Sequence, residues 1–368
     1  MHICLVSVEI FAWGKYGGFG RATRTIGREL AQAGVQVTAI VPRRHGQAKE
    51  EMLDGIRVLG FDITDPAEMW QIFRDCDADI FHSEEPSMGT WLAQVAHPEK
   101  KHVVTFRDTR LFSDWLIELQ LPSLNKFQVL FNWFYEDNFL VHHAVRAANR
   151  RFVAAHLLIE RSRKKYWLSK DPIFLPTPVE IPATEQKAET PTVVYVGRWD
   201  RRKRPELVLE LARTFPDVCF VVAGSSRDVE YDQKLRSQFS TLPNVELTGF
   251  INQFESDRLS QILSRSWILI NTAAREGLPN AFIEACAHRC AVLSSVDPDD
   301  FSSRFGIFVA NDEFGHGLAT LLDGNRWKEL GEKGYEYVMQ TFSTDISIQK
   351  HIEMYTQLLQ ENGKEYSQ

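Results

Sequence analysis

Long apolar runs are missing from this 368-residue chain: no stretch approaches the ~20 apolar residues that a membrane-spanning helix needs. The opening residues, MHICLVSVE, lack a basic n-region and a cleavage site, so we interpret them as a first strand and not as a signal peptide. Cysteine is scarce as well, and five scattered residues fit reduced thiols. Together these absences predict a cytoplasmic protein.

Positive charge is not in excess either, because 42 Lys and Arg face 49 Asp and Glu, a formal net charge of −7. This balance argues against a nucleic-acid partner for the whole protein. No G-x-G-x-x-G follows the first apolar run, which disfavours a dinucleotide-dependent dehydrogenase, and no P-loop is present. Aspartate pairs at 75–79 and 297–300, and the Cys286 and Cys290 thiols, resemble metal-ligand spacings, but we interpret them as structural.

Short apolar runs alternate with helix-like segments along the whole chain, which is typical of a doubly wound parallel sheet. In the first half we expect strands at residues 3–8, 35–41, 55–61, 79–82, 102–106 and 152–155. A proline-containing connection at 171–190 separates them from further expected strands at 192–197, 218–223, 245–248, 267–270 and 291–295. We therefore predict three parts: an N-terminal Rossmann-like domain at 1–175, a second one at 176–340, and a C-terminal helical segment at 341–368 that packs back on the first domain.

The most informative stretch follows the expected strand at 267–270. A polar loop carries Glu276, Pro279 precedes a helix that we expect Asn280 to cap, and Glu284 lies inside that helix. A helix N-terminus suits a phosphate, and a carboxylate can accept hydrogen bonds from sugar or ribose hydroxyls. The combination predicts a sugar-nucleotide site. The alternative is an ordinary strand–loop–helix connection in which a glutamate only caps the helix or interacts with its dipole.

Two further loops follow expected strands, where ligands of doubly wound sheets bind. Residues 197–205 contain five cations, among them Arg198 and Lys203, which could bind a pyrophosphate and stabilise a departing nucleotide. A glycine-rich loop at 14–21, with Gly17 and Gly18 before a helix, permits close approach of backbone to a ligand. Each of these loops alone could equally be a solvated connection.

In its second half the sequence resembles the retaining GT-B glycosyltransferases of glycosyltransferase family 4, also called group 1. The matching motifs are Gly197-Arg198-x4-Lys203, Leu247-Thr248-Gly249-Phe250 and Glu276-Gly277-Leu278-Pro279-x4-Glu284-Ala285, in the family's order and spacing. The first half matches more loosely, through Gly17-Gly18 and Thr105-Phe106-Arg107-Asp108. The resemblance implies two Rossmann-like domains that face each other across a cleft.

The resemblance also implies a role for each matched residue. Arg198 and Lys203 would hold the donor pyrophosphate, Glu276 would contact the transferred sugar, and Glu284 would accept from the ribose hydroxyls. Further donor contacts would come from Gly17, Gly18, Gly249, Phe250, Ile251, Gly277, Leu278, Pro279 and Asn280. The implied reaction moves a sugar from a nucleotide-sugar, UDP- or GDP-linked, to a hydroxyl of a glycan, lipid-linked or small-molecule acceptor, with retention of configuration. It needs no metal and no cofactor, since the donor is a co-substrate.

One departure from the family pattern concerns the reacting sugar. Members usually carry a histidine where this chain has Arg107, and an arginine cannot act as a base at neutral pH. We expect Arg107 to be a catalytic-site residue that hydrogen-bonds sugar or phosphate. Two alternatives stay open: a GT-B nucleotide-sugar epimerase that uses no acceptor, and a non-catalytic nucleotide-sugar-binding module.

A second patterned region joins aromatic residues to a basic segment. Residues 146–170, from Arg146 to Lys170, carry eight basic residues and one acidic residue. Upstream, residues 124–149 have the spacing of a helix, and aromatic residues recur in it every three to four positions: Phe127, Phe131, Phe134, Tyr135 and Phe139. We interpret these as a core-facing stripe followed by a solvated helix end; the alternative is peripheral contact with the inner face of an anionic membrane.

Overall fold

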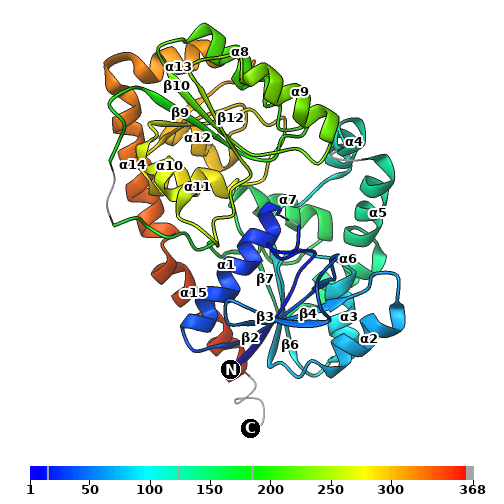
Figure 1. Cartoon of the computed structure of the whole chain (residues 1–368). Coiled ribbons are helices and arrows are strands. Elements are labelled where there is room, and N and C mark those ends of the chain that lie inside the picture. Colours follow the sequence, from blue (N-terminus) through cyan, green and yellow to red (C-terminus); the bar gives the residue numbers. More distant parts are fainter. Residues whose placement is uncertain (15, 123–124, 184–185, 362–368) are drawn as a thin grey trace. The chain divides into compact units, whose positions relative to one another are not determined.

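The computed structural model describes residues 1–14, 16–122, 125–183 and 186–361 of the chain (Figure 1). Lys15 of the glycine-rich loop, residue 124 of the expected aromatic helix, residues 184–185 of the predicted connection and residues 362–368 of the predicted C-terminal segment lie outside these ranges. The chain forms two compact units. Unit 1 comprises Met1–Leu111, Leu130–Pro178 and Thr344–Gln368, and unit 2 comprises Phe112–Val129 and Val179–Ser343.

Within the described residues, unit 1 is built on an eight-stranded sheet of order β3-β4-β2-β1-β5-β6-β7-β8, in which β3 alone is antiparallel to its neighbour. Its strands are β1 (His2–Val6), β2 (Gln36–Pro42), β3 (Glu50–Leu53), β4 (Ile56–Phe61), β5 (Ile80–Ser83), β6 (Lys101–Phe106), β7 (Arg150–Val153) and β8 (Ile173–Phe174). Its helices are α1 (Gly18–Gln32), α2 (Pro66–Asp75), α3 (Met88–Ala96), α6 (Phe139–Ala147), α7 (Leu157–Tyr166) and α15 (Thr344–Gln360), and α5 (Lys126–Glu136) spans the boundary with unit 2.

Alternate residues of β1 show how this sheet is covered on both faces. Ile3 and Leu5 join a core cluster with Ile26 and Leu30 of α1 and with α15, whereas Cys4 and Val6 face the cluster that contains α2 and α3. Burial on both faces is what a parallel sheet requires, and it explains the unbroken apolar runs in the sequence.

Unit 2 contains a six-stranded, wholly parallel sheet of order β11-β10-β9-β12-β13-β14 within the described residues. Its strands are β9 (Thr192–Val196), β10 (Cys219–Ala223), β11 (Val245–Gly249), β12 (Ile268–Asn271), β13 (Ala291–Ser294) and β14 (Gly306–Phe308). Its helices are α4 (Phe112–Gln120), α8 (Glu206–Thr214), α9 (Val229–Phe239), α10 (Arg258–Arg265), α11 (Asn280–Ala287), α12 (Phe301–Phe305), α13 (Phe314–Leu322) and α14 (Arg326–Thr341), with short 3-10 turns η1 (Pro298–Asp300) and η2 (Asp323–Asn325).

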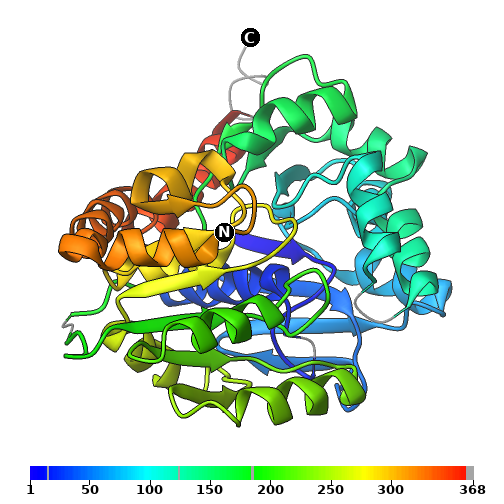
Figure 2. The ribbon, with the colours of Figure 1, turned by 90° about the horizontal axis from the view of Figure 1, so that it is seen from above.

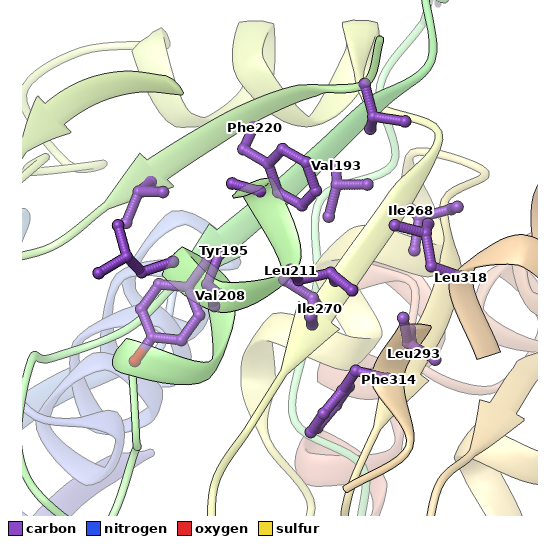
Figure 3. Packing of buried hydrophobic residues seen from close by; sticks show 14 of the residues in the cluster. Val193, Tyr195, Val208, Leu211, Phe220, Ile268, Ile270, Leu293, Phe314 and Leu318 are labelled. Carbon is purple, nitrogen blue, oxygen red and sulfur yellow. The ribbon is translucent and has the colours of Figure 1, made fainter. Parts of the chain in front are cut away.

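The largest core cluster of unit 2 lies between this sheet and helices α8, α9 and α13 (Figure 3). Val193, Phe220 and Ile268 point into it from three neighbouring strands, and Leu211 and Leu318 meet them from α8 and α13 (Figure 3). In the turned view of Figure 2, the green and orange helices of unit 2 again lie beside its strands. The sequence prediction of a doubly wound parallel sheet in each half is confirmed.

Three local expectations were wrong. The helix expected over residues 124–149 is two helices in its described part, because Asn138 interrupts it and caps α6 by accepting from the Leu140 and Val141 amides. Pro279, not Asn280, is the N-cap of α11, and Asn280 is its first helical residue. The aromatic stripe does not face the core: Phe127, Phe131, Phe134 and Phe139 are all exposed, and Tyr135 is half-buried. None of the helices in the described part of the chain is long and apolar enough to span a membrane.

Candidate active site

The strand order of unit 2 reverses between β9 and β12, since the chain runs outward from β9 to β10 and β11 and then returns to β12 on its other side. Ligands of doubly wound sheets bind at such a switch point, outside the carboxyl ends of the strands. The loop after β9, residues 197–205, and the loop after β12, residues 272–279, flank this position. They hold Arg198, Lys203 and Glu276.

Lys203 and Glu276 meet across the switch point, where the Lys203 ammonium donates to Glu276 Oε1. Both side chains are mostly buried, at 23% and 16% exposed. The two loops are also joined through backbone, because Thr272 Oγ1 donates to the Lys203 carbonyl at 2.6 Å and the Ala274 amide donates to the Arg202 carbonyl at 2.8 Å. The structure therefore brings together a predicted phosphate ligand and a predicted sugar ligand.

Arg198 occupies the start of the same basic loop. Its guanidinium lies 3.5 Å from the buried Asp200 carboxylate and is 41% exposed, more than the Lys203 side chain. Asp200 organises the loop through its backbone carbonyl and its carboxylate, which both accept from the Lys203 amide. Arg198 thus presents a positive charge to solvent at the end of β9.

The remaining predicted donor contacts of unit 2 lie on neighbouring loops. Residues 276–280 are half-buried, and Glu284 follows on the second turn of α11, also half-buried. Gly249 ends β11 with a φ of 70°, a left-handed conformation that favours glycine, and its carbonyl accepts from the Gly224 amide at 2.9 Å. Phe250 beyond it is 44% exposed, and Ile251 is half-buried.

Two acidic residues of α4 were missed by the sequence analysis. Arg202 of the β9 loop pairs with Glu118 at 2.8 Å, and Arg275 of the β12 loop pairs with Asp114 at 2.9 Å. All four side chains are at most 18% exposed. The signal was present in the sequence, because Asp114 and Glu118 are one helical turn apart in a helix that is otherwise mostly apolar. Helix α4 therefore anchors both loops that carry the predicted donor residues.

In unit 1 an acid that the sequence analysis also missed packs against the glycine-rich loop. The Glu9 carboxylate, just beyond β1, accepts from the Gly20 amide at 3.0 Å in the first turn of α1. A Cβ atom on Gly17 would lie 2.0 Å from Glu9 Oε1, whereas one on Gly18 would meet nothing within 4 Å. Gly17 is thus required by the packing of Glu9, and the start of α1 already holds a carboxylate.

Arg107 lies directly after β6 and is buried, at 8% exposed. Its Nε and one terminal nitrogen donate to Glu84 Oε2, the former at 2.7 Å, and its other terminal nitrogen donates to Thr177 Oγ1 at 2.8 Å. Burial raises the pKa of Glu84, but the charges of Arg107 and two histidines outweigh this effect and leave the pKa below its ordinary value. Arg107 is therefore fixed by protein groups that no sequence motif indicated.

Next to this pair, Glu85 accepts from the backbone amides of Arg107 at 2.7 Å and Asp108 at 3.1 Å. Burial raises the pKa of Glu85 to about 7 despite these hydrogen bonds. His82 lies between Thr105 Oγ1 and the Tyr355 hydroxyl, each at 2.7 Å, and burial lowers its pKa to about 4. Since Tyr355 belongs to α15, the C-terminal helix contributes to the packing under the β5 and β6 loops.

Two family models match most of the chain. Residues 16–175 match the model of the Glycosyltransferase Family 4 domain, and residues 178–299 match that of the Glycosyl transferases group 1 domain. The O-antigen biosynthesis glycosyltransferase WbnH of Escherichia coli is 29% identical over 150 residues. That alignment covers 39% of this chain and spans about two-fifths, 41%, of the relative.

Solved structures share the fold over nearly the whole chain. Sucrose-phosphate synthase from Thermosynechococcus elongatus superposes with a TM-score of 0.73 at 17% identity, covering 97% of this chain and 98% of that one. HepE of Anabaena in complex with UDP-glucose gives 0.70 at 13% identity, covering 96% and 99%. The two parallel-sheet units thus match those of GT-B glycosyltransferase structures. Residues 16–175 thus resemble a Glycosyltransferase Family 4 domain, and residues 178–299 resemble a Glycosyl transferases group 1 domain.

Proposed function

We propose that the protein is a retaining, metal-independent glycosyltransferase that moves a sugar from a nucleotide-sugar to an acceptor hydroxyl. The observation that carries this proposal is the contact of Lys203 with Glu276 at the switch point of unit 2, with Arg198 in the same loop as Lys203. A cation for phosphate and an acid for sugar hydroxyls are adjacent there, as the diphosphate and the sugar are adjacent in a nucleotide-sugar.

In the proposed donor complex the ion pair is exchanged for two ligand contacts. Lys203 turns to the diphosphate together with Arg198, and Glu276 accepts from hydroxyls of the transferred sugar. Glu284 accepts from the ribose hydroxyls, and the backbone of residues 277–280 lies along the sugar and phosphates. Since the two cations supply positive charge where the leaving diphosphate becomes negative, the reaction needs no divalent ion.

The proposed chemical step breaks the bond between the anomeric carbon and the diphosphate oxygen and forms one to the acceptor oxygen on the same face of the sugar. The departing diphosphate takes the proton of the acceptor hydroxyl, so charge and atoms balance. Unit 1 selects the acceptor in this scheme, and Arg107 acts on the reacting sugar or phosphate, directly or by fixing the loops around it.

Two relatives support the choice of substrates. A solved structure of similar fold holds UDP-glucose, which favours a UDP-linked donor, with GDP-sugars as the second choice. A curated relative is named for O-antigen biosynthesis, which favours a glycan or lipid-linked acceptor. Peripheral contact with the inner face of the membrane through residues 146–170 is part of the proposal.

The test is a transfer assay with UDP- and GDP-sugars and a panel of acceptors, followed by NMR of the product and repeated with EDTA. We expect the donor's anomeric configuration in the product and the same rate with EDTA. An inverted product, or loss of activity that a divalent ion restores, contradicts the mechanism. Conversion of the donor to an epimer without an acceptor would identify a nucleotide-sugar epimerase.

The commitment of Arg107 to Glu84 and Thr177 favours one further candidate, a nucleotide-sugar-binding module without turnover. In that case a donor would bind, and neither transfer nor hydrolysis would follow with any acceptor of the panel.

A further inference from the structure

A series of buried polar side chains connects helix α15 to Arg107 within unit 1. The Tyr355 hydroxyl lies 2.7 Å from His82 Nδ1, and His82 Nε2 lies 2.7 Å from Thr105 Oγ1. The same His82 nitrogen lies 3.5 Å from Glu84 Oε1, and Glu84 accepts from the Arg107 guanidinium through its other oxygen, Oε2. All five residues are at most 8% exposed. A buried network of this kind fixes its members only where the polar atoms have suitable partners.

Glu84 Oε1 is the atom of this network with the poorest hydrogen bonding. Among the described residues no hydrogen bond reaches this buried oxygen. Burial raises the pKa of Glu84, but the charges of Arg107 and two histidines bring it below its ordinary value, so the carboxylate is ionised at pH 7. A buried anionic oxygen without a donor is costly. The polarity of the nearby His82 nitrogen therefore matters for the position of the Glu84 side chain.

The tautomer of His82 determines what Glu84 Oε1 meets. Burial lowers the pKa of His82 to about 4, so at pH 7 the ring is neutral, with one nitrogen donating and the other accepting. If Nε2 carries the proton, an N–H group faces both Thr105 Oγ1 and the Glu84 carboxylate. If Nδ1 carries it, a nitrogen lone pair faces the negative carboxylate. Electrostatics favours the first form, in which Nδ1 accepts and Tyr355 is its donor.

Tyr355 has the properties that this donor needs. Burial and the charge of Glu84 raise the pKa of its hydroxyl well above the ordinary value, so the hydroxyl keeps its proton. Within the described part of the chain, His82 Nδ1 is the hydrogen-bond partner of that hydroxyl. His351, one turn earlier in α15, is committed to its own helix, because its Nδ1 donates to the Ser347 carbonyl at 2.8 Å. Tyr355 is therefore the residue of α15 that sets the proton of His82.

We propose that Tyr355 is a positioning residue for the transfer reaction: it holds His82 as the Nε2–H tautomer, which stabilises the Glu84 carboxylate that orients Arg107. The same ring also holds Thr105, two positions before Arg107 at the end of β6. Helix α15 thus acts on the loop after β6 through hydrogen bonds and without contact to a substrate. The inference rests on the proposed function, in which Arg107 acts on the reacting sugar or phosphate.

The first measurement determines the tautomer of His82 directly. In protein with nitrogen-15-labelled histidine at pH 7, the NMR shifts of the ring nitrogens distinguish a protonated Nε2 from a protonated Nδ1, and His82→Asn identifies the signals by their loss. We expect the Nε2–H form in the wild type. In Tyr355→Phe we expect a shift towards the Nδ1–H form, because Nδ1 has lost its donor. An Nδ1–H ring in the wild type, or an unchanged ring in the variant, overturns the proposal.

Transfer kinetics test the consequence for Arg107. Tyr355→Phe should lower turnover about tenfold and change donor affinity less than about twofold, because a misaligned group at the reacting atoms weakens the transition state more than the ground state. The matched control is Tyr166→Phe, which removes a hydroxyl from another buried tyrosine of unit 1, stacked on Phe106 at 5.2 Å between ring centroids. The control should keep wild-type turnover. Equal losses in both variants, or none in Tyr355→Phe, overturn the positioning role.

A second background separates positioning from general packing. In Glu84→Gln/Arg107→Met, the further change Tyr355→Phe should lower the remaining turnover no more, because the groups through which Tyr355 acts are gone. The same loss of turnover in this background as in the wild type overturns the proposal. If the wild type transfers sugar and Tyr355→Phe transfers it equally fast, this inference alone fails. If the wild type transfers sugar from no donor, the proposed function fails, and the inference fails with it.

Discussion

Lys203 and Glu276 form an ion pair between two loops, 73 residues apart in the sequence, at the place where the strand order of unit 2 reverses. When no donor is bound, each of the two charges compensates the other. A nucleotide-sugar would offer its diphosphate to Lys203 and its sugar hydroxyls to Glu276. One favourable contact within the protein is then replaced by two with the donor, so substitutions of this pair should affect donor binding most.

Glu284→Ala should weaken donor binding and leave turnover at saturating donor nearly unchanged, because the proposed ribose contact is the same in the ground and transition states. The loss should be about 1.5–3 kcal/mol, the worth of hydrogen bonds to a charged group. Calorimetry with a nucleoside diphosphate and with its 2′,3′-dideoxy analogue measures it. Glu284→Ala should weaken binding of the parent nucleotide but not of the dideoxy analogue. If both ligands lose the same affinity in the variant, the ribose role is contradicted.

Arg107→Ala should lower the free energy of unfolding by about 3–5 kcal/mol, because the buried Glu84 carboxylate loses its cation. In protein that remains folded, we expect turnover to fall more than donor affinity does. Denaturant melts and steady-state kinetics measure the two effects. The double variant Glu84→Gln/Arg107→Met, which removes both charges, is the control and should recover much of the stability. Wild-type turnover in that double variant would show that Arg107 is structural.

Glu118→Gln should weaken donor binding about tenfold without contact between Glu118 and the donor, because Arg202 and Arg275 lose charge compensation and the two donor loops shift. Glu329→Gln removes an exposed carboxylate of the same unit and serves as the control. The comparison of donor affinities by calorimetry decides the point. Equal affinities of both variants would show that α4 does not position the site.

Stability should fall as the pH drops from about 6.5 towards 4. His82 is buried with a pKa lowered to about 4, so between these values the unfolded chain binds a proton that the folded chain does not, and protonation favours unfolding. One such group contributes a slope of about 1.4 kcal/mol per pH unit. Chemical melts across this range should show a shallower slope for His82→Asn than for the wild type; parallel slopes would exclude His82 as a source.

Much of the fold was readable from the sequence, because parallel strands buried on both faces leave short apolar runs, such as residues 267–270 ahead of Glu276. The candidate donor residues were found for a related reason. Arg198, Lys203 and Glu276 each lie in a loop that follows a strand, and strand ends of one parallel sheet share an edge.

What escaped prediction depends on partners that are distant in sequence. The spacing of Asp114 and Glu118 did not reveal that Arg202 is the partner of Glu118, and Glu84 gives no sign that it will fix Arg107. The aromatic spacing at Phe127–Phe134 predicted a helix correctly and its orientation wrongly, since periodicity shows that a helix has two faces but not which of them is covered.

The most direct test of the donor site is a calorimetric titration of UDP-, GDP- and ADP-sugars into the wild type and into Lys203→Ala and Glu276→Ala, with transfer rates measured on the same samples. We expect at least one donor to bind the wild type and Lys203→Ala to lose most of that affinity. Glu276→Ala should lower turnover by about 10²–10³ with the fold intact. Donor binding and turnover at wild-type levels in both variants would contradict it.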